Sequence, residues 1–470
     1  MANTYLTRTV TSAGNRKTWT FSCWVKRCVT SANGSVGYDS IFSTNISNVG
    51  INIAFGNGAF TNTGDYFEVT HAAASGGGTT DWSVRTNQLF GDVAGWYHLV
   101  VAFDTTQSTT ADRVKIYVNG VEVDKTVTTG PALNTDYEIN NTQQHTIGRW
   151  QRDGNSYFDG SLAHFHFCDG TAYQASDFGQ TDSTTGIWKP KSAPSVTYGT
   201  NGFFLKFASS GSMGTDSSGN SNTWAVSGGT LTQTQDTPSN VFATLNPLVI
   251  NRFANAGTPT NGNTSIAFTG GDADTGMEFS TMGVTSGKWY WEIKMPVITR
   301  ASFGVGYMQD LVAFTNTYYD NSPSKGFSVY ASSGDLNYDN TYTTYGSAFS
   351  SNDIAMVALD MDNHLCWFGK NGTWFNSATQ SEIENSTATN DATTAMGTQQ
   401  NLNNGEYVFP FVMDSSTTGQ SSFHMNFGNG YFGTTAVSTA NSDANGYGLF
   451  EYSVPSGYYA LCTKNIKEFG

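Results

Sequence analysis

Short segments in which apolar and polar residues alternate recur along the chain and constrain its fold more than any other feature. Residues 18–27, TWTFSCWVKR, place large apolar side chains on one face, which is the pattern of a half-buried strand. The pairs Asn119-Gly120 and Asn371-Gly372 accept the positive φ angles that a tight hairpin turn requires. No stretch of a dozen residues shows helical periodicity. The chain is therefore expected to be all-β.

The expected strands form two groups that are not repeats of each other. Between them lies a stretch rich in Ser, Gly, Thr and Asn, which is typical of a linker. We therefore expect two antiparallel β-sandwiches in tandem: a domain at 1–207, a linker at 208–245, and a domain at 246–470 whose C-terminal tail packs on it. The expected strands are 18–27, 97–103, 113–118, 157–169 and 203–207 in the first group, and 277–283, 287–295, 302–307, 326–331, 354–360, 364–368, 407–413 and 422–427 in the second.

Charge and composition exclude several classes of function. The chain has 470 residues and a net charge of −15, with only 22 Lys and Arg. Nucleic acids and anionic membranes require clustered basic side chains, so neither is an expected partner. No apolar run is long enough to span a membrane, and the N-terminus lacks the pattern of a secretory signal. Five scattered cysteines are expected to be buried free thiols.

The first half carries a specific order of short motifs: Trp19 to Lys26, Gly95 to Val100, Ile116 to Gly120, Ile147-Gly148-Arg149 and Phe158-Asp159-Gly160. In this order the first half resembles the laminin-G-like, or concanavalin A-like, jelly-roll family. The resemblance covers about residues 1–207 and implies a sandwich of two sheets.

The second half carries a different order of motifs: Gly287 to Glu292, Phe303 to Tyr307, Asp353 to Asp360, Lys370-Asn371-Gly372, Val408 to Phe411 and Met425 to Gly428. In this order the second half resembles a SPRY domain, which implies a second sandwich that binds partners through variable loops.

The tandem, with its joining segment 238–247 and its ending 455–465, resembles virion proteins of tailed bacteriophages. This resemblance implies a virion-surface protein that folds in the host cytoplasm and acts as a tail fibre or receptor-binding protein. Its partners would be other virion proteins and a host surface glycan or protein, and a homo-oligomer, a trimer in such fibres, is expected. The alternative is a capsid decoration or head-fibre protein, and a polysaccharide depolymerase is the least favoured class.

Enzymatic activity is not expected. Glycoside hydrolysis usually requires two carboxylates that flank one bond. Glu122 and Asp124 have the same strand parity, but they follow the Asn119-Gly120 turn and are interpreted as a solvated face. No Ser, His and Asp combination shows the context of a nucleophile.

Calcium is the only cofactor for which we expect candidate ligands. Loop carboxylates at Asp104, Asp112, Asp153 and Asp159 could hold it at the rim of a jelly roll, although no Asp-x-Asp-x-Asp loop is present. His164 and His166 are expected on one face of a strand, exposed or facing a loop, without a third metal ligand.

Two loops of the second half combine aromatic rings with short amide and carboxylate side chains. Rings that stack on a sugar, beside acceptors for its hydroxyl groups, are typical of glycan sites, and protein partners use the same residues. These loops are the predicted ligand-binding site, with tyrosines that cover a sheet edge as the alternative interpretation. The candidate residues are Tyr318, Tyr319, Asp320, Asn321, Tyr338, Asp339, Asn340 and Tyr342.

Overall fold

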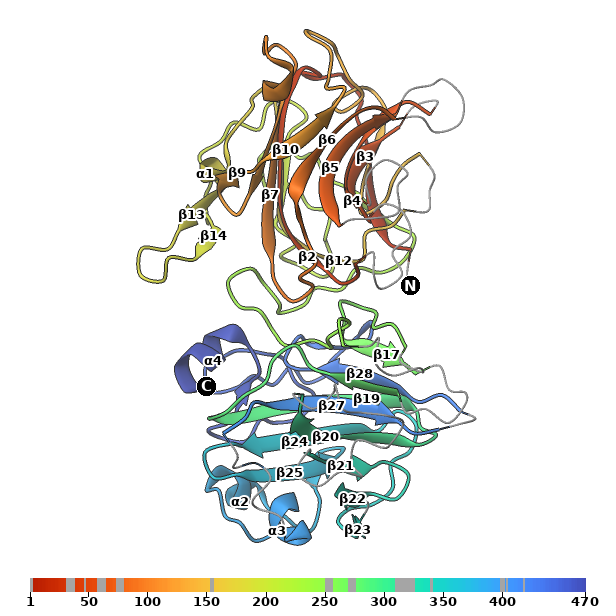
Figure 1. Ribbon diagram of the computed structural model, residues 1–470, viewed down its shortest axis with the longest axis vertical. Helices are drawn as coiled ribbons and strands as arrows, with labels where there is room; N and C mark the ends of the chain where they lie inside the picture. Colours follow the sequence, from red (N-terminus) through yellow and green to blue (C-terminus); the bar gives the residue numbers. More distant parts are fainter. Residues whose placement is uncertain are drawn as a thin grey trace. The chain divides into compact units, whose positions relative to one another are not determined.

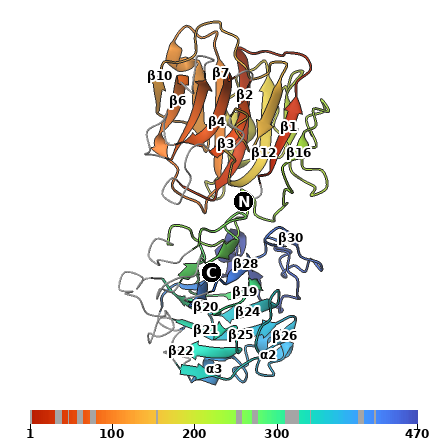
Figure 2. The ribbon, with the colours of Figure 1, turned by 90° about the vertical axis from the view of Figure 1, so that its right-hand side faces the viewer.

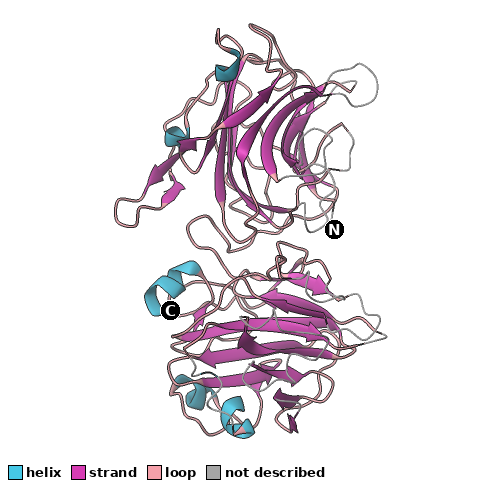
Figure 3. Cartoon of the chain, viewed as in Figure 1, coloured by secondary structure: helices cyan, strands magenta, loops and turns pink. Residues whose placement is uncertain are grey.

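The computed structural model divides the chain into two compact units, Met1–Gln233 and Thr234–Gly470 (Figure 1). It describes residues 3–30, 39–45, 48–56, 65–72, 80–152, 156–249, 257–268, 276–308, 326–338, 341–397, 402, 405–416 and 419–470. Strands dominate both units, and the few helices are short (Figure 3). The predicted all-β fold class is confirmed.

The first unit contains an eight-stranded antiparallel sheet in the order β10-β6-β5-β4-β3-β11-β1-β16. Figure 2 shows β16 beside β1 at one end of this sheet. Its strands are β1 (Tyr5–Thr9), β3 (Asp39–Thr44), β4 (Gly50–Gly56), β5 (Tyr66–Ala72), β6 (Thr80–Leu89), β10 (Lys125–Thr128), β11 (Gln144–Ile147) and β16 (Ala225–Ser227).

A six-stranded antiparallel sheet, in the order β15-β12-β2-β7-β8-β9, forms the other layer. The turn between β8 and β9 is the predicted hairpin, with φ angles of 48° at Asn119 and 91° at Gly120. The strands are β2 (Thr18–Arg27), β7 (Tyr97–Asp104), β8 (Val114–Val118), β9 (Val121–Glu122), β12 (Gly160–Asp169) and β15 (Phe203–Leu205); the short elements η2 (Thr110–Asp112), α1 (Ala175–Phe178), β13 (Gly179–Thr181) and β14 (Trp188–Pro190) complete the unit.

Aromatic side chains fill the space between these two sheets. Trp19 stacks on Phe103 with ring centroids 4.5 Å apart, and Phe21 meets Phe165 edge to face at 5.2 Å. Such pairs add about 0.5–1.5 kcal/mol each to the free energy gained by burying the rings. All five cysteines are free and buried, as the sequence predicts.

The segment 208–245 differs from the predicted linker because it is divided between the two units. Its first part pairs β16 with β1 and buries Trp224, which is 4% exposed, in the core of the first unit. Its last part buries Phe242 and Leu245 in the second unit. Small polar residues around these apolar side chains made the segment resemble a loop.

The second unit also packs two sheets face to face around an apolar core. One sheet has the order β17-β28-β19-β24-β25-β26, with β31 pairing in parallel with β19. Its strands are β17 (Ser265–Ala267), β19 (Lys288–Val297), β24 (Ile354–Asp360), β25 (Leu365–Lys370), β26 (Thr373–Trp374), β28 (Ser422–Asn426) and β31 (Tyr459–Ala460).

The opposite sheet of the second unit has the order β18-β27-β20-β21-β22-β23. Short elements outside the two sheets are β29 (Tyr431–Phe432), β30 (Thr435–Ala436), α2 (Gln380–Glu384), α3 (Ala392–Met396) and α4 (Thr463–Phe469). The strands of the sheet are β18 (Gly276–Phe279), β20 (Ala301–Tyr307), β21 (Gly326–Tyr330), β22 (Asp335–Tyr338), β23 (Thr341–Thr343) and β27 (Val408–Asp414).

A buried carboxylate on β19 holds the C-terminal segment against the sheet. Glu292 accepts hydrogen bonds from the backbone N–H groups of Glu451 at 2.9 Å and Tyr452 at 2.8 Å. It also accepts from the Tyr290 hydroxyl at 3.0 Å and from the Asn426 amide at 3.2 Å. Burial raises the pKa of Glu292 to about 7, although these four donors favour the ionised form. The segment beyond residue 440 thereby covers the outer face of this sheet with Phe450 and Tyr458.

Replacing Trp224 tests whether the segment after residue 207 belongs to the first unit. We expect Trp224→Ala to lower the free energy of unfolding of that unit by about 3–5 kcal/mol, because the change leaves a cavity in its core. Calorimetry of the full chain would measure the loss. Val226→Ala, on the neighbouring β16 at 42% exposure, is the control and should cost less than about 0.5 kcal/mol. Equal effects of the two variants would contradict the assignment.

Candidate functional site

A row of hydroxyl and amide side chains crosses the outer face of the eight-stranded sheet. Each member is the direct cross-strand neighbour of the next, and the residues that alternate with them, such as Leu6, Ile53 and Val84, point into the core. We call this set the polar row. It consists of Thr7, Thr146, Ser43, Asn52, Thr70, Ser83 and Thr128.

Two side chains on this face are buried without the partners that their polar atoms require. Glu68, 1% exposed, has no hydrogen bond to either carboxyl oxygen, and Asn52 has none to its Nδ2. Asn52 Oδ1 accepts a bond of 2.5 Å from Ser40. Burial raises the pKa of Glu68 to about 7, and the charge of Arg85 opposes that rise. Unpartnered buried groups are rare in folded proteins and often mark a site that water or a ligand completes.

One end of the polar row is partly open and carries aromatic rings. Tyr5, whose neighbour Leu6 faces the core, lies with its ring 3.8 Å from the Arg149 guanidinium carbon. The ring of Tyr157 lies 6.1 Å from that of Tyr5, and Tyr157 forms a backbone bridge with Arg149. Arg149 donates a bond of 2.8 Å to Gln151 Oε1. We call these four half-buried residues the tyrosine–arginine patch.

Hydrogen bonds join the tyrosine–arginine patch to the polar row. Ser43 donates to the backbone carbonyl of Arg149 at 3.0 Å and accepts from the backbone N–H of Gln151 at 2.8 Å. Thr146 also donates to the Arg149 carbonyl, at 2.7 Å. The sheet therefore fixes the backbone of the patch, and a ligand would meet rings, a guanidinium and amides at set positions.

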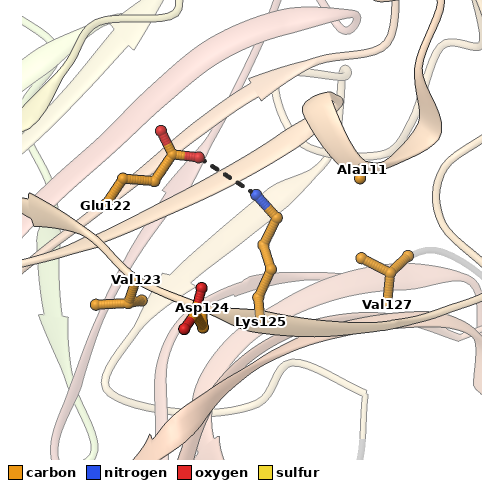
Figure 4. Close-up of a pocket in the computed structure, with 6 residues that line it drawn as sticks. All are labelled: Ala111, Glu122, Val123, Asp124, Lys125 and Val127. Carbon is orange, nitrogen blue, oxygen red and sulfur yellow. Dashed lines mark ion pairs between the residues drawn. The ribbon is translucent and has the colours of Figure 1, made fainter.

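A surface pocket with a cavity volume of about 410 Å³ lies at the edge of the first unit (Figure 4). Val123 and Val127 line it and pack against the core. Lys125 points inward, its side chain 11% exposed, with its Nζ 3.5 Å from Glu122 Oε1. Lys115 lies 3.8 Å from the other oxygen of Glu122. Inward-pointing charges are a common device that protects sheet edges from pairing, and we assign Lys125 that role.

A buried Ser–His pair on the six-stranded sheet has the wrong proton arrangement for nucleophilic catalysis. The Trp188 indole N–H donates to Nδ1 of His98 at 3.0 Å, so Nε2 carries the proton and donates to Ser22 Oγ at 2.9 Å. Burial lowers the pKa of His98 to about 3, which keeps the ring neutral. A general base would have to accept the serine proton at Nε2, so His98 cannot activate Ser22 in this arrangement.

His164 and His166 lie on a common face, as expected, because both rings stack on Phe204, at 6.0 Å and 3.9 Å, although β12 bulges between Ala163 and His166. His164 has a φ of 47°. His166 is 2% exposed, stacks on Phe204 at 3.9 Å and bonds to the Tyr198 hydroxyl at 2.8 Å. This histidine is a packed structural residue.

Of the predicted calcium ligands, Asp104 and Asp159 lie far apart. Asp104 pairs with Thr18 at the start of β2, whereas Asp159 precedes the residue that pairs with Arg27 at its end. Those positions are about 30 Å apart at roughly 3.3 Å per residue. Asp112 is exposed on η2, and Asp153 lies outside the described residues. In the part of the chain that the structure describes, no three His, Cys, Asp or Glu side chains could hold a metal ion.

Asp159 and Asp104 have different surroundings. Burial, with the neighbouring charge of Asp39, raises the pKa of Asp159 to about 6. Asp104 instead accepts hydrogen bonds from Thr106 at 2.6 Å and Gln107 at 2.6 Å, which close its own turn.

Only two of the predicted ligand-binding residues in the second unit can be placed. Tyr338 packs against the core, whereas Tyr342, 53% exposed, lies on the outer face with its ring 6.0 Å from Tyr330. The two rings therefore do not form one platform. Tyr318, Tyr319, Asp320, Asn321, Asp339 and Asn340 lie outside the described residues.

Residues 2–176 match the family described as the concanavalin A-like lectin/glucanases superfamily. The first unit is thus similar to concanavalin A-like domains, in agreement with the predicted resemblance. No curated protein matches the sequence.

Several solved structures are similar to the chain. The SPRY domain of human HERC1 is 20% identical, with a TM-score of 0.28, over 38% of this chain and 96% of that one. A second human SPRY domain is 15% identical, with a TM-score of 0.25, over 34% of this chain and 90% of that one. Stonustoxin is 17% identical, with a TM-score of 0.26, over 39% of this chain and 27% of that one. Among the described residues, no helix is long and apolar enough to cross a membrane.

The raised pKa of Glu68 makes a prediction about pH and stability. The pKa of Glu68 is about 7 in the folded protein and 4.5 in the unfolded chain. The protonated side chain therefore contributes its full share of the folding stability below about pH 4.5. This contribution is lost as the pH rises through 7, on the order of 3 kcal/mol in total. The free energy of unfolding should therefore fall between pH 5 and pH 8, and Glu68→Gln should remove the part of this fall that comes from Glu68. Urea unfolding at the two pH values would measure it.

Buried histidines with lowered pKa values, such as His98 and His145, change the stability with pH in the opposite direction. The wild type and the variant share these histidines, so their effect cancels in the comparison. Asp136→Asn, at an exposed acid of the same unit, is the control and should leave the difference unchanged. A Glu68→Gln protein with the pH dependence of the wild type would refute a protonated Glu68.

Proposed function

We propose that this protein is a virion-surface recognition protein of a tailed bacteriophage, of the tail-fibre or receptor-binding kind, and that its first unit binds a host surface glycan. The observation that carries the proposal is the tyrosine–arginine patch at the open end of the polar row. Two half-buried tyrosine rings, a guanidinium and an amide meet there on a rigid sheet.

This combination of groups suits a sugar. The flat face of a pyranose stacks on tyrosine rings, and its hydroxyl groups need fixed donors and acceptors. Gln151 and the exposed Gln144 are joined by a bond of 2.8 Å and supply amides beside the rings. The likeness of residues 2–176 to a superfamily named for lectins and glucanases supports the same class of ligand.

We propose binding without cleavage. The carboxylate of Glu122 lies between Lys115 and Lys125, which suits a solvated face better than a pair of catalytic acids. The phage setting is supported by the resemblance of the joining and ending segments to virion proteins.

Removing the rings should weaken glycan binding. We expect Tyr5→Ala and Tyr157→Ala each to lower the affinity for a host surface polysaccharide roughly tenfold, because each deletes a stacking face. Biolayer interferometry with polysaccharide from the host would measure the loss. Tyr407→Ala, which removes an exposed tyrosine from the second unit, is the matched control. Unchanged affinity in both patch variants would refute the assignment to this site.

Immuno-gold labelling of particles separates the proposed role from the alternative. Label on the tail agrees with a tail fibre or receptor-binding protein. Label confined to the head would replace that role with capsid decoration.

A further inference from the structure

Arg149 is a cation that has no counter-ion among the described residues of a strongly acidic chain. The chain carries 37 Asp and Glu against 22 Lys and Arg. Arg27, by contrast, contacts Asp39 at 3.0 Å and Asp65 at 2.9 Å. No carboxylate among the described residues lies within ion-pair distance of Arg149, whose one side-chain hydrogen bond goes to Gln151, and its Nε has no acceptor.

A second arginine lies close by in the sequence and also faces an aromatic ring. The Arg152 guanidinium carbon is 5.6 Å from the ring of Trp150. It too has no carboxylate partner among the described residues. Two arginines lie over aromatic rings and have no carboxylate partner among the described residues of an acidic chain, which favours an anion supplied by a ligand.

We propose that the tyrosine–arginine patch is a subsite for the carboxylate of an acidic sugar. The inference rests on the proposed function and names its ligand class: a polysaccharide that contains uronic acids. The planar guanidinium of Arg149 matches a carboxylate in a two-point contact. The rings of Tyr5 and Tyr157 flank that position and receive the face of the sugar.

A purely structural role for Arg149, in which it only holds Tyr5 in place, predicts a different result for the Arg149→Lys variant. Arg149→Lys would then keep a cation above the ring and leave binding largely intact. A carboxylate subsite needs the planar fork, so the lysine variant should bind nearly as weakly as Arg149→Gln.

The test measures binding of the full chain to three carboxylated polysaccharides: polygalacturonate, alginate and hyaluronate. Methyl-esterified polygalacturonate, with the same sugar and no charge, is the matched ligand control. The variants are Arg149→Gln, Arg149→Lys, Tyr5→Ala and Lys191→Gln, the last of which removes a charge that contacts the Ser176 carbonyl at 2.6 Å. Thermal unfolding checks that each variant folds.

We expect the wild type and Lys191→Gln to bind at least one carboxylated polysaccharide at least tenfold more tightly than the ester. Arg149→Gln and Arg149→Lys should lose that preference. The proposal is overturned if the wild type binds none of the three, if it binds the ester equally, or if the Arg149 variants keep the preference. Competition by inorganic phosphate at the concentration at which galacturonate competes would also overturn it, since the subsite would then take any anion.

The outcome separates this proposal from the proposed function. Glycan binding that falls in Tyr5→Ala but not in the Arg149 variants would leave glycan recognition standing and remove the carboxylate subsite. If all the patch variants keep the affinity of the wild type, both glycan binding at the patch and the carboxylate subsite are refuted.

Discussion

The alternation of inward and outward side chains along each strand is the constraint on which the rest of this structure depends. In the eight-stranded sheet, the row Leu6, Ile147, Phe42, Ile53, Val69 and Val84 faces the core, and the adjacent row faces outward. A shift of one residue in any strand would exchange the two faces. The aromatic core therefore also sets the register of the polar row and fixes where Tyr5 and Arg149 meet.

The sequence predicts the strands in which apolar and polar positions contrast strongly. β2, β7, β8 and β19 were expected close to their observed bounds, because large aromatic or branched residues alternate in them. Strands β3 to β6 were missed. Their outward positions carry Ser, Thr, Asn and Gly, residues that are typical of loops, so the segments read as turn-rich. The same ambiguity led to the predicted linker at 208–245.

The candidate site could not be read from local sequence. Tyr5 and Arg149 are 144 positions apart, and only the antiparallel pairing of β1 with β11 brings them together. Residues 147–149 contributed to the resemblance to a jelly roll, yet nothing in that motif indicated that its arginine has no carboxylate partner among the described residues. Tyr338 and Tyr342, the two predicted ligand-binding residues that can be placed, lie on opposite faces of their sheet, a consequence of strand geometry that loop composition does not reveal.

The clamp at Glu292 also bears on biosynthesis. Its acceptor oxygens are satisfied by amides that follow 159 and 160 positions later in the chain. A nascent polypeptide emerging from the ribosome exposes β19 long before those amides are made. The outer layer of the second unit can close only after residues 451 and 452 have left the ribosome, so this unit folds as a whole once its own last segment is made.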